Sequence, residues 1–274
     1  MIGQAERLHE LNRLKRYGRN GKKRGAVFGV TSGKGGTGKS FMTISMAHSL
    51  ARNNNRVLVV DLDANLSNIN IMMNVNPEKN LYHYLRDSVT LEETIYRHSG
   101  TLHFIFGESG RTDHPFMNAN TVERFFMQLW LLAKKYDFIL LDTAAGAGED
   151  VITILKNSDA RLIVTTPEPT AVMDAYALIK LMKFAGVEEK KYIIVNMCST
   201  LMEGKTAYDN LDKAIKHFLK ENLKLLGLVE RDQKISKSIL DQSVFMKDFS
   251  ESRIARQIIK ITKDLQTVRD RMEF

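Results

Sequence analysis

The stretch Gly33–Ser40, with the sequence GKGGTGKS, decides the fold of this 274-residue chain. It follows a short apolar run, Ala26–Thr31, and a helical pattern opens at Lys39. Closely spaced glycines let consecutive backbone N–H groups curl around a phosphate group, and the first turn of the helix adds the positive end of its dipole. Motif and context together predict a phosphate-binding loop; the alternative is a glycine-rich turn without chemistry.

Each side chain of this loop has an expected role toward a nucleoside triphosphate. Lys39 is expected to reach the β- and γ-phosphates, and the Ser40 hydroxyl to ligate Mg²⁺. The chain lacks the Asn/Thr-Lys-x-Asp motif of guanine-binding proteins, so we expect ATP as the nucleotide. The residues predicted to contact it at the loop are Gly33, Gly35, Gly36, Thr37, Gly38, Lys39, Ser40 and Phe41.

Outward from the loop, short apolar runs alternate with helical patterns. In the stretch 171–184, for example, apolar side chains recur three and four residues apart. Near-continuous apolar runs are typical of parallel strands that are covered on both faces. The further strand candidates are Arg56–Asp61, Leu102–Phe106, Phe138–Asp142, Arg161–Thr165, Tyr192–Asn196 and Leu223–Val229. We therefore predict an α/β fold: a doubly wound, mainly parallel sheet flanked by helices.

Composition favours a cytoplasmic protein with one large core. The length and the 43% hydrophobic content suffice for such a core. The first residues are polar and basic, and no apolar run approaches the roughly 18 residues of a membrane span, so neither a secretory signal nor a span is expected. The single cysteine, Cys198, excludes an internal disulfide and fits a reducing compartment.

The net charge of +8 is concentrated at the N-terminus. Residues 1–25 carry eight Lys or Arg and two Glu, a net of +6, which leaves +2 for the rest of the chain. Because non-specific DNA binding needs a basic surface, the near-neutral body argues against DNA as a partner. We expect three segments: a basic N-terminal segment (1–24), an ATPase domain (25–266) and a C-terminal amphipathic tip (267–274).

Acidic residues follow two of the predicted strands. Asp61 and Asp63 are two residues apart, so both side chains leave the same face of the chain near the phosphate loop. Asp142 closes the run that begins at Phe138. Carboxylates beside a phosphate loop suit magnesium binding and the positioning of a water molecule. The alternative for Asp63 is an ordinary turn residue after a strand.

These motifs, in this order, resemble those of the MinD/ParA family of ATPases over about residues 26–266. GKGGTGKS resembles the family's deviant Walker A motif, KGGxGK[ST], whose early lysine crosses a dimer interface to the partner's nucleotide. The resemblance implies an ATP-dependent homodimer in which Lys34 is an intermolecular counterpart of an arginine finger. The alternative for Lys34 is a solvated surface lysine. The catalytic residues implied are Lys34, Lys39 and Asp63.

The same resemblance assigns roles to the positions that follow. Asp61 would belong to the water shell of the magnesium ion, Asp63 would orient the attacking water, and Asp142 would be an outer-sphere partner of the metal. Gly146 would sense the γ-phosphate, although Ala144 replaces the proline that the family has in this segment. The residues implied in metal binding are Ser40, Asp61 and Asp142.

Three later features complete the resemblance. The dipeptide Pro167-Glu168 resembles a segment near the family's dimer interface, or it is a simple strand-to-helix turn. Asn196 matches an asparagine whose amide reads the adenine edge, since an amide can pair with a donor and an acceptor together. Asp232 matches the end of the signature G-x-[IV]-P-x-D and is expected at the nucleotide, although Glu230 stands in place of the proline.

The N-terminal segment resembles that of the FlhG subfamily, MinD-like regulators of flagellar number and placement. Gln4, Ala5 and Leu8 match the motif D-Q-A-x-x-L-R, while its aspartate and arginine are absent. The resemblance implies that this segment docks as a short helix on the SRP-type GTPase FlhF and stimulates it, with flagellar basal-body components as further partners. The charge run Lys22–Arg24 is expected to be a solvated linker; attraction to nucleic acid or anionic lipid is the alternative.

The C-terminal stretch from Ile254 has apolar positions four and three residues apart with basic residues beside them, which predicts an amphipathic helix. It resembles the last core helix of the family over Ser250–Leu265. Alternatively, it is a membrane-targeting helix that places the protein peripherally on inner-membrane lipids, at the cytoplasmic face.

The family resemblance leaves the cellular process open, because a shared fold does not determine function. An FlhG-type regulator is the first hypothesis. The alternatives are a ParA-like partition ATPase that binds DNA, a MinD-like division-site ATPase, and a regulator that binds ATP but barely hydrolyses it.

Overall fold

The structure is a computed structural model, and it describes residues 24–63, 67–108, 117–187 and 190–272. These ranges include the whole predicted phosphate loop and the predicted catalytic, nucleotide-binding and metal-binding residues. The predicted partner-binding residues Gln4, Ala5 and Leu8 lie outside the described residues.

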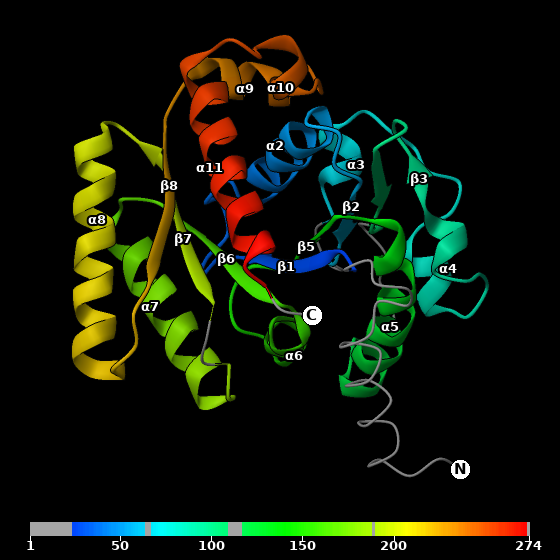
Figure 1. The fold of residues 1–274 in the computed structure, drawn as a ribbon, viewed down its shortest axis with the longest axis horizontal. Coiled ribbons are helices and arrows are strands. Elements are labelled where there is room, and N and C mark those ends of the chain that lie inside the picture. Colours follow the sequence, from blue (N-terminus) through cyan, green and yellow to red (C-terminus); the bar gives the residue numbers. More distant parts are fainter. Residues whose placement is uncertain (1–23, 64–66, 109–116, 188–189, 273–274) are drawn as a thin grey trace.

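A sheet of eight strands runs through the described residues (Figure 1), in the order β3-β4-β2-β5-β1-β6-β7-β8. Neighbouring strands are parallel, except that β3 and β4 are antiparallel. The strands are β1 Ala26–Thr31, β2 Val57–Asp61, β3 Tyr96–Arg97, β4 Leu102–Ile105, β5 Phe138–Asp142, β6 Ala160–Thr165, β7 Lys191–Cys198 and β8 Lys224–Glu230. The predicted α/β fold with a mainly parallel sheet is confirmed, and the added edge strand β3 is too short to leave an apolar run in the sequence.

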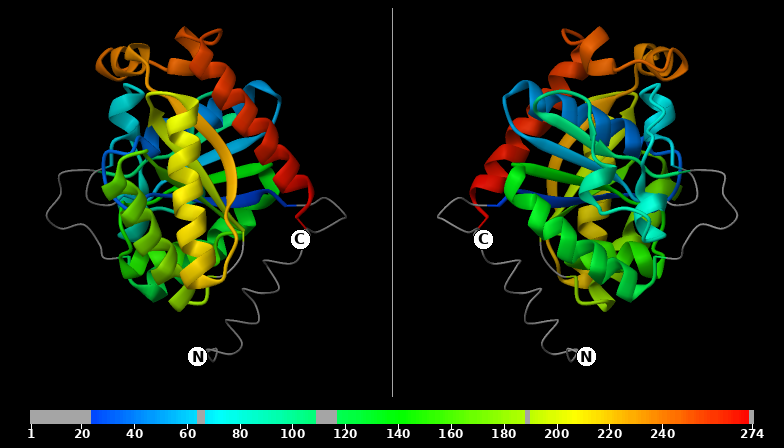
Figure 2. Two further views of the ribbon diagram at one scale, coloured as in Figure 1. Left: turned by 90° about the vertical axis from the view of Figure 1, so that its left-hand side faces the viewer. Right: turned by 90° about the vertical axis from the view of Figure 1, so that its right-hand side faces the viewer.

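Helices cover both faces of this sheet, with α11 on one side and α7 on the other (Figure 2). One buried cluster joins α2 and α11 to alternate residues of the strands, such as Phe28, while Val27 faces a second cluster with α5. A third cluster holds α6, α7 and α8 against β6 and β7. The helices are α2 Lys39–Arg52, α3 Ile69–Met72, α4 Leu81–Leu85, α5 Ala119–Leu132, α6 Glu149–Asn157, α7 Pro169–Phe184, α8 Leu201–Ala214, α9 Gln233–Leu240, α10 Phe245–Asp248 and α11 Arg253–Asp270.

The strand order brings several strand ends to one edge of the sheet. From β1 the chain passes through α2 to β2, and β5 lies between β1 and β2. The carboxyl ends of β1, β2 and β5 are therefore neighbours, with Asp61 and Asp142 in register on adjacent strands. In open α/β sheets the ligand crevice lies outside the carboxyl ends of the strands, at the point where the strand order reverses.

Arg24 corrects the prediction of a solvated linker over Lys22–Arg24. Its side chain is 2% exposed, and its two terminal nitrogens each donate to a carboxylate oxygen of Asp159 at 2.8 Å. The guanidinium also lies 4.2 Å from the ring centre of Trp130. The linker prediction was wrong for Arg24 because its partner lies 135 residues further along the chain.

The C-terminal helix α11 packs as a core helix. The Ser252 hydroxyl accepts the backbone N–H of Ala255 and so caps the first turn. The apolar face is buried against β8 and α2, and a Cβ atom added at Gly227 of β8 would lie 2.2 Å from Ile261. The helix continues past residue 266, and Met272 beyond it is also buried. Among the described residues, no helix combines the length and the apolar character needed to cross a bilayer.

Candidate nucleotide site

The phosphate loop, residues 32–38, connects the end of β1 to the first turn of α2. Gly36 and Gly38 have φ of 78° and 80°, a left-handed conformation that side chains disfavour. A Cβ atom at Gly35 or Gly36 would meet no atom of the described residues within 4 Å, so the outer rim of the loop faces open space there. At the start of the loop the opposite holds, because a Cβ atom at Gly33 would lie 2.3 Å from the backbone of Asp174 in α7. The loop is thus supported from behind and open in front.

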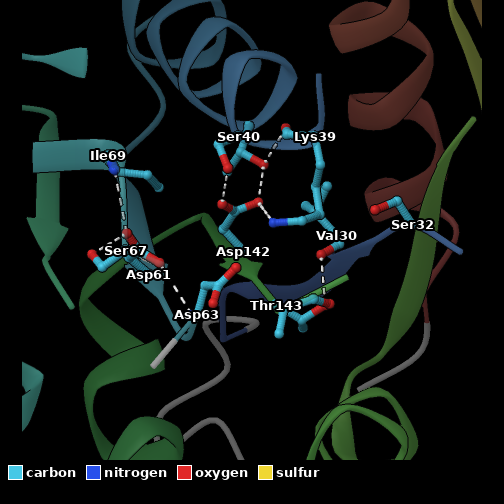
Figure 3. Close-up of polar contacts among 12 residues, drawn as sticks. Val30, Ser32, Lys39, Ser40, Asp61, Asp63, Ser67, Ile69, Asp142 and Thr143 are labelled. Atoms are coloured by element: carbon cyan, nitrogen blue, oxygen red, sulfur yellow. Dashed lines mark hydrogen bonds and ion pairs between the residues drawn. The ribbon is translucent and has the colours of Figure 1, made fainter. Parts of the chain in front are cut away.

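Two side chains of the loop and helix meet on Asp142 (Figure 3). Lys39 Nζ lies 2.9 Å from Asp142 Oδ1, and the Ser40 hydroxyl donates to Oδ2 at 2.6 Å. The Thr43 hydroxyl also lies 2.9 Å from Oδ1. Thr43 was not predicted from the sequence, although it lies one helical turn after Lys39 and therefore on the same face of α2. The predicted loop lysine, serine and strand-end aspartate thus converge.

Asp61 lies beside this group at the end of β2 (Figure 3). Its side chain is buried, and Ser67 donates its hydroxyl to Oδ2 at 2.7 Å. Burial raises the pKa of Asp61, and the neighbouring Asp142 carboxylate raises it further, to about 7. Ser67 was not predicted either; no spacing rule connects it to Asp61. Two carboxylates on adjacent strand ends favour a cation between or in front of them.

A cavity of about 450 Å³ opens in front of the loop. Asp63 lines it, and its backbone N–H donates to Asp61 Oδ1 at 3.2 Å. Phe41 lines it from α2 and packs edge-on against Phe245, while Ile239 of α9 closes the other side. The volume is within the range of small-molecule sites. Ile239 gave no signal in the sequence, because an apolar residue on a surface helix looks like any other.

Lys34 lies on the exposed rim of the loop, in contrast to the buried Lys39. Its ammonium group donates to Glu168 Oε2 at 2.9 Å and to the Thr170 hydroxyl at 3.2 Å. This contact lowers the pKa of Glu168, through the hydrogen bond and the charge of Lys34. The dipeptide Pro167-Glu168 is therefore a turn into α7 that also contacts the loop.

Three further predicted site residues, Gly146, Asn196 and Asp232, differ in the contacts that they make. Gly146 has φ of 92°, and its N–H donates to the Ser32 carbonyl of the loop at 2.8 Å. Asn196 is buried behind the loop and donates its side-chain N–H to the Thr37 carbonyl at 2.9 Å. Asp232 caps α9 by accepting the N–H of Lys234, and it does not line the cavity.

The donor groups present fit a magnesium nucleotide. The open rim at Gly35 and Gly36 leaves room for phosphate groups, and the buried Thr37 hydroxyl has no hydrogen-bond partner among the described residues. Magnesium is typically held by one or two carboxylates together with phosphate oxygens and water. Ser40, Asp61 and Asp142 provide that set, and the described residues contain no cluster of three or more His, Cys, Asp or Glu suited to an all-protein metal site.

The strand order, the glycine-rich loop and the aspartate at the end of the adjacent strand define a P-loop NTPase. Residues 24–266 match the ParA family, described as NUBPL iron-transfer P-loop NTPase. The chain belongs to this family, the MinD/ParA family of P-loop NTPases, and is an ATPase.

Several relatives resemble the chain over most of its length. The flagellum site-determining protein YlxH of Helicobacter pylori is 33% identical over 233 residues, 81% of this chain and 78% of that protein. The antiactivator FleN of Pseudomonas aeruginosa is 27% identical and covers 83% of this chain and 81% of its own length. The cell division ATPase MinD of Pyrococcus furiosus has the same fold, with a TM-score of 0.76 and 23% identity over 89% of this chain and 99% of that one.

Proposed function

We propose that this protein is an FlhG-type switch that dimerises on ATP and regulates the number or placement of flagella. The observation that carries the proposal is the different position of two lysines of one loop. Lys39 is buried on Asp142, whereas Lys34 is on the rim and accessible to a second subunit. The similarity to YlxH and FleN supports the flagellar assignment.

The buried residues account for nucleotide binding. Lys39 would hold the β- and γ-phosphates, and Ser40, Asp61 and Asp142 would hold the magnesium ion directly or through water. Magnesium neutralises charge on the phosphates and so favours attack by water. Asp63, at the cavity wall, is the carboxylate that would orient this water. Gly146 is the candidate sensor of the γ-phosphate; its N–H, which here donates to the Ser32 carbonyl, would have to turn from the loop to the phosphate.

Lys34 would have to leave Glu168 in order to reach a partner's nucleotide. The pair is exposed on both sides, with 32% and 58% of the two side chains accessible. Exposed ion pairs contribute little to stability because water solvates both charges when they separate. The contact on the same chain is therefore compatible with an intermolecular role.

Light scattering with and without ATP and Mg²⁺ tests this switch. The wild-type chain should double in mass with ATP, Lys39→Ala should stay monomeric, and Asp63→Ala should accumulate as a dimer. Lys213→Ala, which removes an exposed lysine from α8, is the matched control and should behave as wild type. One unchanged mass for wild type, Lys39→Ala and Asp63→Ala would refute the ATP-dependent dimer.

The flagellar role depends on residues 1–23, which we propose bind and stimulate an FlhF-like GTPase through Gln4, Ala5 and Leu8. A peptide of residues 1–20 should raise the GTPase rate of FlhF from the same cell. The same peptide with Gln4→Ala should bind but not stimulate. If neither peptide changes the rate, the FlhF proposal fails, although the ATP switch stands.

DNA binding and membrane attachment are tested separately. A ParA-like partition role requires DNA binding that weakens with salt and survives deletion of residues 1–23; we expect none, because the rest of the chain is nearly neutral. Peripheral attachment to anionic inner-membrane lipids predicts co-flotation with vesicles in ATP. Since the apolar face of α11 is packed in the core, attachment would require residues other than that face.

A further inference from the structure

The end of β7 carries an irregularity directly behind the phosphate loop. Between the pairs Val195↔Leu228 and Cys198↔Glu230, β7 has two residues where β8 has one, which is a β-bulge. The second of the two, Met197, has φ of 57°, a conformation that costs energy for a residue with a side chain. Bulges beside functional sites redirect side chains, and here the redirected residue is Asn196.

The Asn196 amide is packed tightly against the loop. Its Nδ2 donates to the Thr37 carbonyl at 2.9 Å, across 159 residues of sequence. A Cβ atom at Gly38 would lie 2.3 Å from the same nitrogen, so the loop approaches this closely only because residue 38 is glycine. The orientation of the amide is determined, since a carbonyl oxygen can only accept a hydrogen bond and must face the NH₂ group.

This hydrogen bond also affects the direction of the Gly38 N–H. The Thr37 carbonyl and the Gly38 N–H belong to one planar trans peptide, in which they point in opposite directions. Holding the carbonyl toward β7 therefore turns the Gly38 N–H away from β7, to the side on which the loop is open. Phosphate-binding loops depend on N–H groups aimed in this way.

We propose that Asn196 is a positioning residue that sets the phosphate loop for any polyphosphate, whatever base it carries. The inference rests on the proposed nucleotide site and deepens it. The amide has two ends, and only the NH₂ end is bound to the loop; Oδ1 is buried, and the part of the chain that the structure describes offers it no hydrogen-bond partner. A role in reading adenine would use Oδ1, so the two roles affect different ligands.

Calorimetric titration of wild type and Asn196→Ala with ATP, GTP and inorganic triphosphate, all with Mg²⁺, separates these roles. Loss of a buried hydrogen bond at the loop should weaken binding of all three ligands by about tenfold. Asn196→Asp should weaken all three further, because a carboxylate would face the Thr37 carbonyl. Asn222→Ala, at the opposite end of the β7–β8 pair, is the control and should bind as wild type.

Unchanged affinity of Asn196→Ala for inorganic triphosphate would overturn the positioning role. A loss of affinity confined to ATP would also overturn it and would indicate that Asn196 contacts the base instead. Asn196→Ser, which stays polar but cannot reach Thr37, serves as a second variant if Asn196→Ala does not fold, and the same three-ligand loss is expected of it. Failure of wild type to bind any of the three ligands would instead refute the proposed nucleotide site.

Discussion

Two buried ion pairs lie at opposite ends of β1, and they differ in the charges that surround them. At the start of the strand, Arg24 holds Asp159, which also accepts the Val27 N–H at 2.8 Å. Beyond its end, Lys39 holds Asp142. Both pairs are almost inaccessible to water, so burial alone does not distinguish them.

The difference is in the charge around each pair. Asp159 faces a bidentate guanidinium that also stacks on Trp130, and the charge of Arg161 acts on the same carboxylate, so positive charge predominates around this pair. Asp142 has three donors but shares its surroundings with Asp61, whose pKa is raised by burial first and by the Asp142 carboxylate second. We expect the first pair to stabilise the fold. The second region has one carboxylate more than its own cation can balance, which is the property expected of a magnesium nucleotide site.

The largest expected effect comes from Lys39→Ala. ATP turnover should fall at least about a hundredfold, as for the loss of one preorganised charge contact in an active site. Stability should change less, because Asp142 keeps its contacts with Ser40 and Thr43. A phosphate-release assay and a urea titration measure the two effects. Wild-type turnover in this variant would contradict the role of Lys39.

Arg24→Ala should show the reverse pattern. Removing one partner of a buried ion pair typically costs about 3–5 kcal/mol, because the remaining charge stays buried. We expect this loss in the free energy of unfolding, with turnover per folded molecule retained. Arg24→Lys should lose less, since it keeps the charge but not the bidentate contact. If Arg24→Ala lost no more free energy of unfolding than Lys39→Ala, the two ion pairs would contribute equally to stability and the proposed difference would be wrong.

The variant Asp61→Asn tests the comparison through the pH dependence of the free energy of unfolding. The pKa of Asp61 in the folded chain, about 7, is above its usual value of 3.8. This group therefore stabilises the fold at low pH, and the contribution is lost as pH rises through 7. Without Mg²⁺, wild type should lose on the order of 1–3 kcal/mol relative to Asp61→Asn between pH 5 and 8. Parallel pH profiles of unfolding for the two chains would contradict the raised pKa.

The smallest effect is expected at the exposed pair Lys34–Glu168. Glu168→Gln removes the charge that holds Lys34 on its own chain, and both groups are solvated. The midpoint of thermal unfolding should stay the same within error, as differential scanning fluorimetry can establish. A drop comparable to that of Arg24→Ala would make this contact a structural lock as well, and would count against an intermolecular Lys34.

Much of the fold could be predicted from apolar runs, and the failures have physical causes. Val57–Asp61 is buried throughout, as its sequence VLVVD indicates. Tyr96–Arg97 has only two residues and no pattern to detect. For α11 the sequence allowed a core helix or a membrane helix, because both need one apolar face; the burial of that face against β8 and α2, with Ile261 on Gly227, distinguishes them.

Some residues of the candidate site could likewise be predicted from the sequence and others could not. Lys39, Ser40 and Asp142 could be predicted, because their motifs fall at strand ends that parallel packing brings together. Thr43, Ser67 and the contact of Asn196 with Thr37 could not. The partners of Thr43 and Asn196 lie 99 and 159 residues away in sequence, and the contact of Ser67 depends on how the chain turns after β2. Serines, threonines and asparagines occur everywhere in a sequence.

By itself, the sequence determined the phosphate loop and its place between a strand and a helix, because glycine conformation and backbone N–H groups act within a few residues. Only the tertiary structure decided what surrounds it. The order β2-β5-β1 places Asp142 102 residues away from Ser40 in sequence but 2.6 Å away in space. The same packing buries Arg24, which the sequence alone left in a basic tail, because a charge is stable in the interior only where the fold supplies its partner.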